Sequence, residues 1–213
     1  MTLVSSAFSP AHAASLSFSL NPFTGSTAKV NVTLDDAVAG AGKVQFTVDV
    51  DKSVSLADIR GVFFNVADSV PLDGLQYSGS DVTAFSATGN VTSVGGSSNN
   101  VNGDGGSQSF DAGLEIGREG LKGGKDDIQS TVFTLSHSSL ALDLSHFANQ
   151  NFGVRLMSVG TGDDREGSSK LAAIVPGQPN DPTDVPEPTS ALALGLVGVG
   201  GVKFLKRKRD LAV

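Results

Sequence analysis

Hydrophobic and polar residues alternate along several short stretches of this chain, and this alternation restricts its fold more than any other feature. Residues 43–50, KVQFTVDV, place Val or Phe at every second position. Successive side chains of an extended strand point to opposite faces, so the stretch predicts a strand with one face in a core and one in water. Residues 16–20 and 30–34 repeat the pattern and predict two more such strands.

Further stretches carry weaker strand signals and are separated by clusters of Gly, Asn, Asp and Ser. They are residues 61–66, 81–85, 90–94, 109–116, 130–136, 140–144 and 151–159. Short strands with turn signals between them predict an all-β body, an antiparallel β-sandwich of about ten strands. The sequence shows no long amphipathic helix pattern, and residues 57–61 and 145–150 are candidates for single helical turns.

The composition excludes several classes of protein. The chain has no cysteine, which excludes a disulfide scaffold, a thiolate zinc site and a cysteine nucleophile. Its net charge is −7 at pH 7, whereas a protein that binds nucleic acid needs a basic face, so we expect no nucleic-acid partner. The charge is uneven, because residues 14–188 hold 10 basic and 21 acidic residues while the other 5 basic residues follow Pro188.

The C-terminal region combines an apolar stretch with a basic cluster. Residues 189–202, TSALALGLVGVGGV, are uncharged, and Lys203 then interrupts the apolar run. A helix over residues 189–205 would be about 25 Å long, at the short limit for a bilayer core of about 30 Å. We expect one transmembrane helix at 189–205, with residues 206–213 as a cytoplasmic tail by the positive-inside rule. A buried core helix or a disordered tail is the alternative for this stretch.

A short motif precedes the apolar stretch, where residues 185–188 read Val-Pro-Glu-Pro. This order of a Pro-Glu-Pro motif, a hydrophobic helix and a basic tail resembles the PEP-CTERM sorting signal. The residues that carry the resemblance are the motif Pro186, Glu187 and Pro188 and the basic cluster Lys206, Arg207, Lys208 and Arg209. Residues 176–188 hold five of the eight prolines, so we expect an extended linker that presents the motif outside the bilayer.

The resemblance implies processing by an exosortase, a membrane-embedded, transpeptidase-like protease of Gram-negative bacteria that make exopolysaccharide and biofilm matrix. The exosortase would recognise the motif while the helix holds the exported precursor in the inner membrane. Cleavage near the motif would release the body to the cell surface or extracellular matrix. The expected partners are therefore the exosortase, the membrane and an extracellular polysaccharide.

Residues 1–13 have features of the end of a secretory signal peptide. Ala11 and Ala13 form an A-x-A cleavage pattern after Pro10, but the basic n-region is missing and the apolar stretch is short. We interpret the segment as a truncated signal peptide, and a frayed N-terminal arm is the alternative. With either interpretation, the predicted ectodomain spans residues 14–175.

Residues 95–109 are rich in Gly, Asn and Ser, and we expect them to form an exposed, mobile loop. A calcium-loop pattern begins in this stretch and assigns positions 1, 3, 5 and 12 to Asn100, Asn102, Asp104 and Asp111. Alternate oxygen-bearing residues in a tight loop supply the ligands that calcium prefers. Position 1 is not Asp and position 12 is not Glu, so an ordinary polar loop is the alternative. Apart from such a calcium ion, we expect no cofactor.

The sequence contains no recognisable catalytic signature. His137 and His146 are the only histidines of the predicted body, and no HExxH, GxSxG or phosphate-loop pattern occurs. Tryptophan is absent and Tyr77 is the one tyrosine, which makes a sugar-stacking platform poor. We expect a non-catalytic interaction module. The alternatives are a calcium-dependent or polysaccharide-binding adhesion domain and an exported glycan hydrolase on a sandwich fold.

Overall fold

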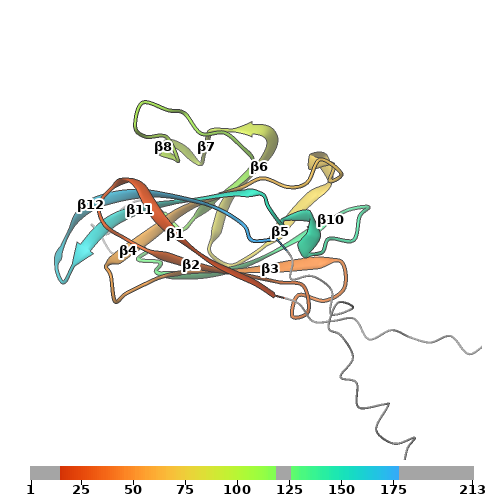
Figure 1. Ribbon diagram of the computed structural model, residues 1–213, viewed down its shortest axis with the longest axis horizontal. Coiled ribbons are helices and arrows are strands. Elements are labelled where there is room, and N and C mark those ends of the chain that lie inside the picture. The colour runs from red at the N-terminus through yellow and green to blue at the C-terminus, as the bar shows by residue number, and fades with distance from the viewer. Residues whose placement is uncertain (1–14, 119–125, 178–213) are drawn as a thin grey trace, which may run out of the picture. The chain divides into compact units, whose positions relative to one another are not determined.

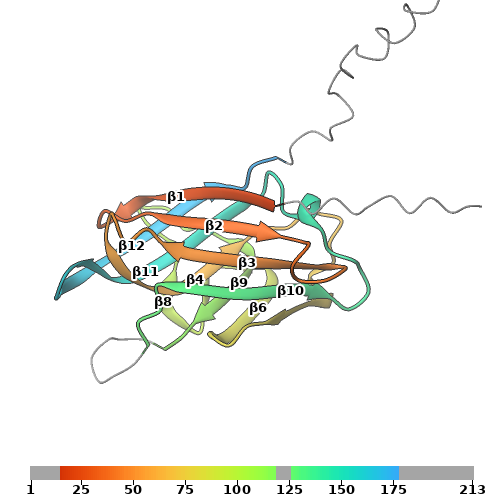
Figure 2. The ribbon, with the colours of Figure 1, turned by 90° about the horizontal axis from the view of Figure 1, so that it is seen from below.

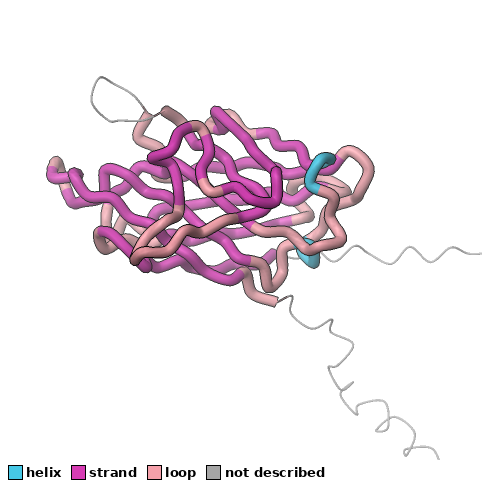
Figure 3. Tube along the Cα trace, turned by 90° about the horizontal axis from the view of Figure 1, so that it is seen from above, coloured by secondary structure: helices cyan, strands magenta, loops and turns pink. Residues whose placement is uncertain are grey.

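Antiparallel β-strands make up most of the protein in a computed structural model that describes residues 15–118 and 126–177 (Figures 1 and 3). The main sheet has 10 strands. They are β1 (Ser15–Gly25), β2 (Val30–Asp35), β3 (Lys43–Val50), β4 (Leu56–Phe64), β5 (Leu75–Ser78), β6 (Val82–Val91), β9 (Phe110–Ile116), β10 (Ser130–His137), β11 (Asn151–Thr161) and β12 (Asp164–Ile174). A separate hairpin consists of β7 (Ser93–Val94) and β8 (Gly96–Asn100), and the 3₁₀ turns are η1 (Leu72–Gly74) and η2 (Leu144–His146).

Strand β1 folds the sheet into two layers because its two halves have different partners. Residues 15–20 pair with β2, and residues 21–25 pair with β12, with a bulge between Pro22 and Thr24. The strand order β5-β10-β3-β2-β1-β12-β11-β4-β9-β6 therefore bends at β1. Figure 2 shows β1, β2, β3 and β10 in one layer, with β12, β11, β4 and β9 behind them.

The two end strands of the sheet, β5 and β6, approach each other and nearly close the fold into a barrel. They are consecutive in the chain, and each is hydrogen-bonded to a ladder partner on its other side. The ring centroids of Tyr77 on β5 and Phe85 on β6 lie 5.1 Å apart. This ring contact therefore joins the two described end strands, which form no ladder with each other.

The core lies between the layers, and phenylalanine rings occupy its centre. Phe46 of β3 is fully buried, and its ring stacks on Phe133 of β10 at a centroid distance of 5.0 Å. The same ring meets Phe147 edge-on at 5.1 Å and lies 6.3 Å from the ring of Phe152 in the opposite layer. Aromatic pairs of this kind add about 0.5–1.5 kcal/mol each beyond the burial of their area. The core face predicted for residues 43–50 is confirmed.

The predicted all-β antiparallel fold is confirmed, but some predicted elements differ. Residues 140–144 do not form a strand, because the backbone turns into η2 and the Asp143 side chain caps that turn. Residues 57–61 belong to β4 and not to a helical turn. Strand β12 is not predicted from the sequence, because the polar residues at its start show no strand pattern.

The β7–β8 hairpin packs on the outer face of the layer that contains β4 and β9 (Figure 1). It takes part in a second, smaller hydrophobic cluster, made of Phe63, Val91, Val94, Val101 and Phe110. Gly61 of β4 leaves room for the buried amide of Asn99, whose Nδ2 donates a hydrogen bond to the Arg60 carbonyl oxygen at 2.8 Å. The expectation that residues 95–109 are an exposed loop is therefore wrong for Asn99 and Val101, which are buried.

Several sequence predictions concern residues outside the described ranges. They are the signal segment 1–13, the part of the linker from residue 178 to Pro188 that holds the motif, the helix at 189–205 and the tail 206–213. Across residues 15–118 and 126–177, no helix has the length and hydrophobicity that a bilayer span requires. All described residues belong to one compact unit, Met1–Gln178.

Candidate functional site

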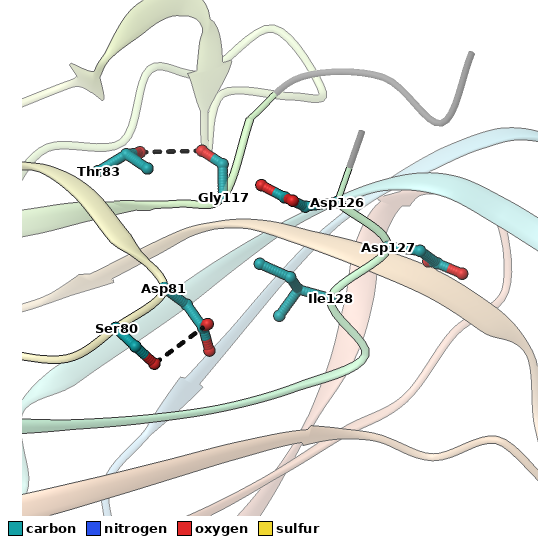
Figure 4. Close-up of a pocket in the computed structure, with 7 residues that line it drawn as sticks. All are labelled: Ser80, Asp81, Thr83, Gly117, Asp126, Asp127 and Ile128. Atoms are coloured by element: carbon teal, nitrogen blue, oxygen red, sulfur yellow. Dashed lines mark hydrogen bonds between the residues drawn. The ribbon is translucent and has the colours of Figure 1, made fainter. Parts of the chain in front are cut away.

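A polar recess of about 310 Å³ opens where the β5–β6 turn, the end of β9 and the segment that enters β10 meet (Figure 4). We call it the acidic recess. Its lining residues are Ser80, Asp81, Thr83, Gly117, Asp126, Asp127 and Ile128. Three of these carry carboxylates, of which Asp81 and Asp126 face the recess, whereas the Asp127 side chain points away from it (Figure 4).

Asp81 is held in place at one wall of the recess by its backbone and by its side chain. The Gly117 N–H donates to the Asp81 carbonyl oxygen at 2.7 Å, which joins the β5–β6 turn to the end of β9. The buried Thr131 hydroxyl donates to Asp81 Oδ2 at 2.9 Å. The Ser80 hydroxyl lies 3.4 Å from Asp81 Oδ1 (Figure 4).

Asp127 connects the segment before β10 to the β11–β12 hairpin. Arg165 of β12 donates from both terminal nitrogens to the two Asp127 oxygens, each at 2.7 Å. The Arg165 Nε–H donates to the Ser158 carbonyl oxygen at 2.9 Å, which fixes the guanidinium plane. The hydrogen bonds from Arg165 lower the pKa of the Asp127 carboxyl group. This carboxylate is therefore ionised and already engaged at neutral pH.

Three charged residues form a cluster behind the recess, which we call the Asp58–Arg60–Glu115 cluster. Arg60 of β4 is only 2% exposed, and it donates to the Ile116 carbonyl oxygen and, at 3.2 Å, to Glu115 Oε1. The Thr83 hydroxyl lies 3.1 Å from Glu115 Oε2, which links the cluster to the recess. A buried guanidinium with several acceptors of this kind fixes the relative positions of the strands that supply them.

Asp58 is the most buried acid of the cluster, with 1% of its surface exposed. Its Oδ1 accepts the Ile128 N–H at 3.0 Å, and its Oδ2 lies 3.9 Å from Arg60 Nε. Burial raises the pKa of the Asp58 carboxyl group to about 6, although the Ile128 N–H and Arg60 both oppose the shift. No motif in the sequence predicts this cluster. The available signal was the pair of charges in Asp58-Ile59-Arg60, which interrupts an otherwise apolar strand.

The two histidines of the body hold loops together. His137 Nε2 lies 2.8 Å from the Pro71 carbonyl oxygen, and His137 Nδ1 accepts the N–H groups of Ser139 and Leu140 at 3.1 Å each. This pattern requires a neutral ring with its proton on Nε2. The Ser139 hydroxyl is 3.5 Å from Nδ1, which the two backbone donors already occupy. His146 belongs to the capping box of η2.

The residues of the predicted calcium loop use their side chains in different ways. Asn100 Oδ1 accepts the Asn102 N–H at 3.0 Å, and Asn102 Oδ1 accepts the Gln108 N–H at 2.9 Å. Asp104 is exposed, with a φ of 50°. Asp111 points elsewhere, because its Oδ2 accepts the Val66 N–H at 3.0 Å. The calcium site stays a prediction, and the described residues contain no group of three His, Cys, Asp or Glu side chains arranged to hold a metal.

A search of this chain against protein-family models, curated proteins and solved structures found no match.

Proposed function

We propose that this protein is an exported surface or matrix protein whose C-terminal signal is processed by an exosortase, and whose β-body is a non-catalytic interaction module. The observation that carries the proposal is the order of three elements in the sequence. Residues 185–188 contain the Pro-Glu-Pro motif, residues 189–202 are uncharged, and the basic cluster at 206–209 follows. A membrane address and a cleavable tether account for this order by simple physical rules.

The motif suits recognition by a protease because of its backbone. Proline fixes its own φ and disfavours helix at the preceding residue, so we expect Val185 and Glu187 to be extended and accessible to the enzyme. In this proposal, the exosortase binds residues 186–188 just outside the membrane and cuts nearby. The body then leaves the membrane while the helix and the basic tail stay behind.

The body supports the module half of the proposal through its polar surface features. The acidic recess presents carboxylate and hydroxyl oxygens, and these accept hydrogen bonds from a hydroxyl-rich ligand such as a polysaccharide. The ring nitrogens of His137 bind backbone groups, which leaves this histidine poorly placed to serve as a base. We therefore assign the body a binding role within the matrix.

The sorting half is tested by expressing the full chain in a Gram-negative host with and without an exosortase. Mass spectrometry of the mature protein then locates both termini. We expect the wild type to lose residues 189–213 only when the enzyme is present, and Glu187→Gln to keep them. Glu166→Gln, an exposed substitution on β12, is the matched control and should be processed like the wild type. An intact C-terminus in both hosts contradicts the sorting half.

The binding half needs a separate measurement. Isothermal titration of the purified, processed protein with matrix polysaccharide should give a heat signal that Asp81→Asn reduces. Asp36→Asn, at a half-buried position after β2 that does not line the recess, is the control and should leave the signal unchanged. Absence of heat for the wild type contradicts the binding role and leaves the sorting half untouched.

A further inference from the structure

The segment 126–129, which enters β10, is joined to β4 by two hydrogen bonds. The Ile59 N–H donates to the Ile128 carbonyl oxygen at 2.7 Å. The Ile128 N–H donates to Asp58 Oδ1 at 3.0 Å. One of the two bonds therefore ends on a titratable group, and that group is 1% exposed.

The second oxygen of Asp58 is poorly compensated. Among the described residues, Oδ2 is buried and has no hydrogen-bond partner. Arg60 Nε lies 3.9 Å away, beyond hydrogen-bond distance, and the terminal nitrogens of Arg60 donate to Ile116 and Glu115. A buried carboxylate in this position costs free energy when it is charged, and much less when it carries a proton.

The charges that face Asp58 come from every neighbouring element. Arg60 on β4 and Arg165 on β12 favour the charged carboxylate, whereas Asp127 on the entering segment opposes it. Glu115 on β9 pairs with Nη2 of Arg60 at 3.2 Å, whereas Asp58 lies 3.9 Å from Nε of the same guanidinium. Burial outweighs the two arginines, so the carboxyl group takes up a proton more readily than an exposed aspartate does.

We propose that Asp58 is a proton-dependent fastener, which holds the segment 126–129 against β4 more firmly when its carboxyl group is neutral. In the neutral state Oδ1 of the Asp58 carboxyl group still accepts the Ile128 N–H, and Asp58 itself carries no buried charge. In the charged state, release of the segment lets water reach Oδ2. Local opening therefore becomes more frequent as the pH rises.

The segment 126–129 also lines the acidic recess, so the shape of the recess depends on whether the Asp58 carboxyl group is protonated. Asp126, Asp127 and Ile128 are three of its seven lining residues. Opening of the segment withdraws Ile128 from the wall and pulls Asp127 from Arg165. The recess is thus better formed in a mildly acidic medium than at neutral pH, whatever ligand it binds.

Hydrogen exchange of the full 213-residue chain, measured residue by residue between pH 5 and pH 7.5, tests the proposal. After correction for base-catalysed exchange, we expect opening at the Ile128 and Ile59 amides to increase about tenfold over this range, as follows from an open-state pKa near 3.8 and a closed-state pKa near 6. Asp58→Asn keeps an acceptor for the Ile128 N–H and removes the charge, so its opening should not change with pH.

Asp111→Asn is the matched control, because Asp111 also accepts a backbone N–H from a neighbouring segment. It should keep the wild-type pH dependence at Ile128. Wild-type opening that does not change with pH, or an Asp58→Asn variant that keeps the dependence, overturns the proposal. If Asp58→Asn does not fold, the carboxyl carbon of Asp58 is titrated by NMR in the wild type. A midpoint near pH 6 supports the fastener, and one near pH 4 overturns it.

Discussion

Replacement of Arg60 by Met tests the energetic role of the Asp58–Arg60–Glu115 cluster. Methionine keeps much of the apolar stem and removes the guanidinium, which is 2% exposed and donates to the Ile116 carbonyl oxygen and to Glu115. Loss of one partner of a buried ion pair costs about 3–5 kcal/mol. Here Asp58 limits the cost, because it can take up a proton and so avoid an uncompensated charge.

We therefore expect Arg60→Met to lower the free energy of unfolding by about 3 kcal/mol at pH 7, near the lower end of that range. Arg60 lowers the pKa of Asp58, so its removal raises that pKa above 6. A carboxyl group with a raised pKa in the folded state adds stability at low pH, and this contribution is lost as the pH rises through the folded-state value. The loss at pH 5 should accordingly be about 1 kcal/mol smaller than at pH 7.

Urea unfolding followed by far-UV circular dichroism at pH 5 and pH 7 measures both quantities. The double variant Asp58→Asn, Arg60→Met is the matched control, and its loss relative to Asp58→Asn should be the same at the two pH values. A single variant as stable as the wild type at pH 7 would refute the assigned role. A loss that is equal at pH 5 and pH 7 would refute the coupling to Asp58.

Three further predictions follow from other parts of the fold. Phe46→Ala removes the ring at the centre of the core and should lower the free energy of unfolding by about 3–5 kcal/mol in the same urea assay, whereas an unchanged midpoint would contradict the packing described. Asp127→Asn should cost under about 1 kcal/mol at pH 7 because Asp127 is partly exposed. Because the pKa of Asp127 is lowered in the folded state, its charge stabilises the fold above pH 3.8, and this stabilisation is lost as the pH falls. The free energy of unfolding of the variant should therefore decrease less on acidification than that of the wild type. Calorimetric titration with calcium should give no heat, because the side-chain oxygens of Asn100 and Asn102 accept hydrogen bonds within the loop. A heat signal in the wild type that is absent in Asp104→Asn would contradict this prediction and support a calcium site.

Strands that have one face in the core could be predicted from the sequence. Residues 43–50 show the alternation because their outer face meets water, and the structure buries every second residue there. Strand β4 shows no such alternation, for the opposite reason. Both of its faces are covered, one by the core and the other partly by the β7–β8 hairpin, so Ala57 to Phe64 are all buried. Period-two patterning fails when a distant segment covers the outer face.

The acidic recess and the cluster behind it were beyond local sequence reasoning. The recess combines Asp81, Gly117 and Asp127, which come from three separate parts of the chain. Asp58 and Arg60 are two residues apart, and two charged residues at this spacing are ordinarily exposed, whereas the structure buries both. Their role depends on acceptors from β9 and on the Ile128 N–H, and only the folded chain brings these neighbours to β4.

The pairing of β1 with β12 affects how fast the chain can fold. The ladder joins Asn21 to Ala172, so the first strand described cannot complete its pairs until nearly the whole body has left the ribosome. Contacts so distant in sequence form slowly, because a long loop must close before they give any gain. We therefore expect a newly made chain of this design to stay unfolded longer than one built from local hairpins.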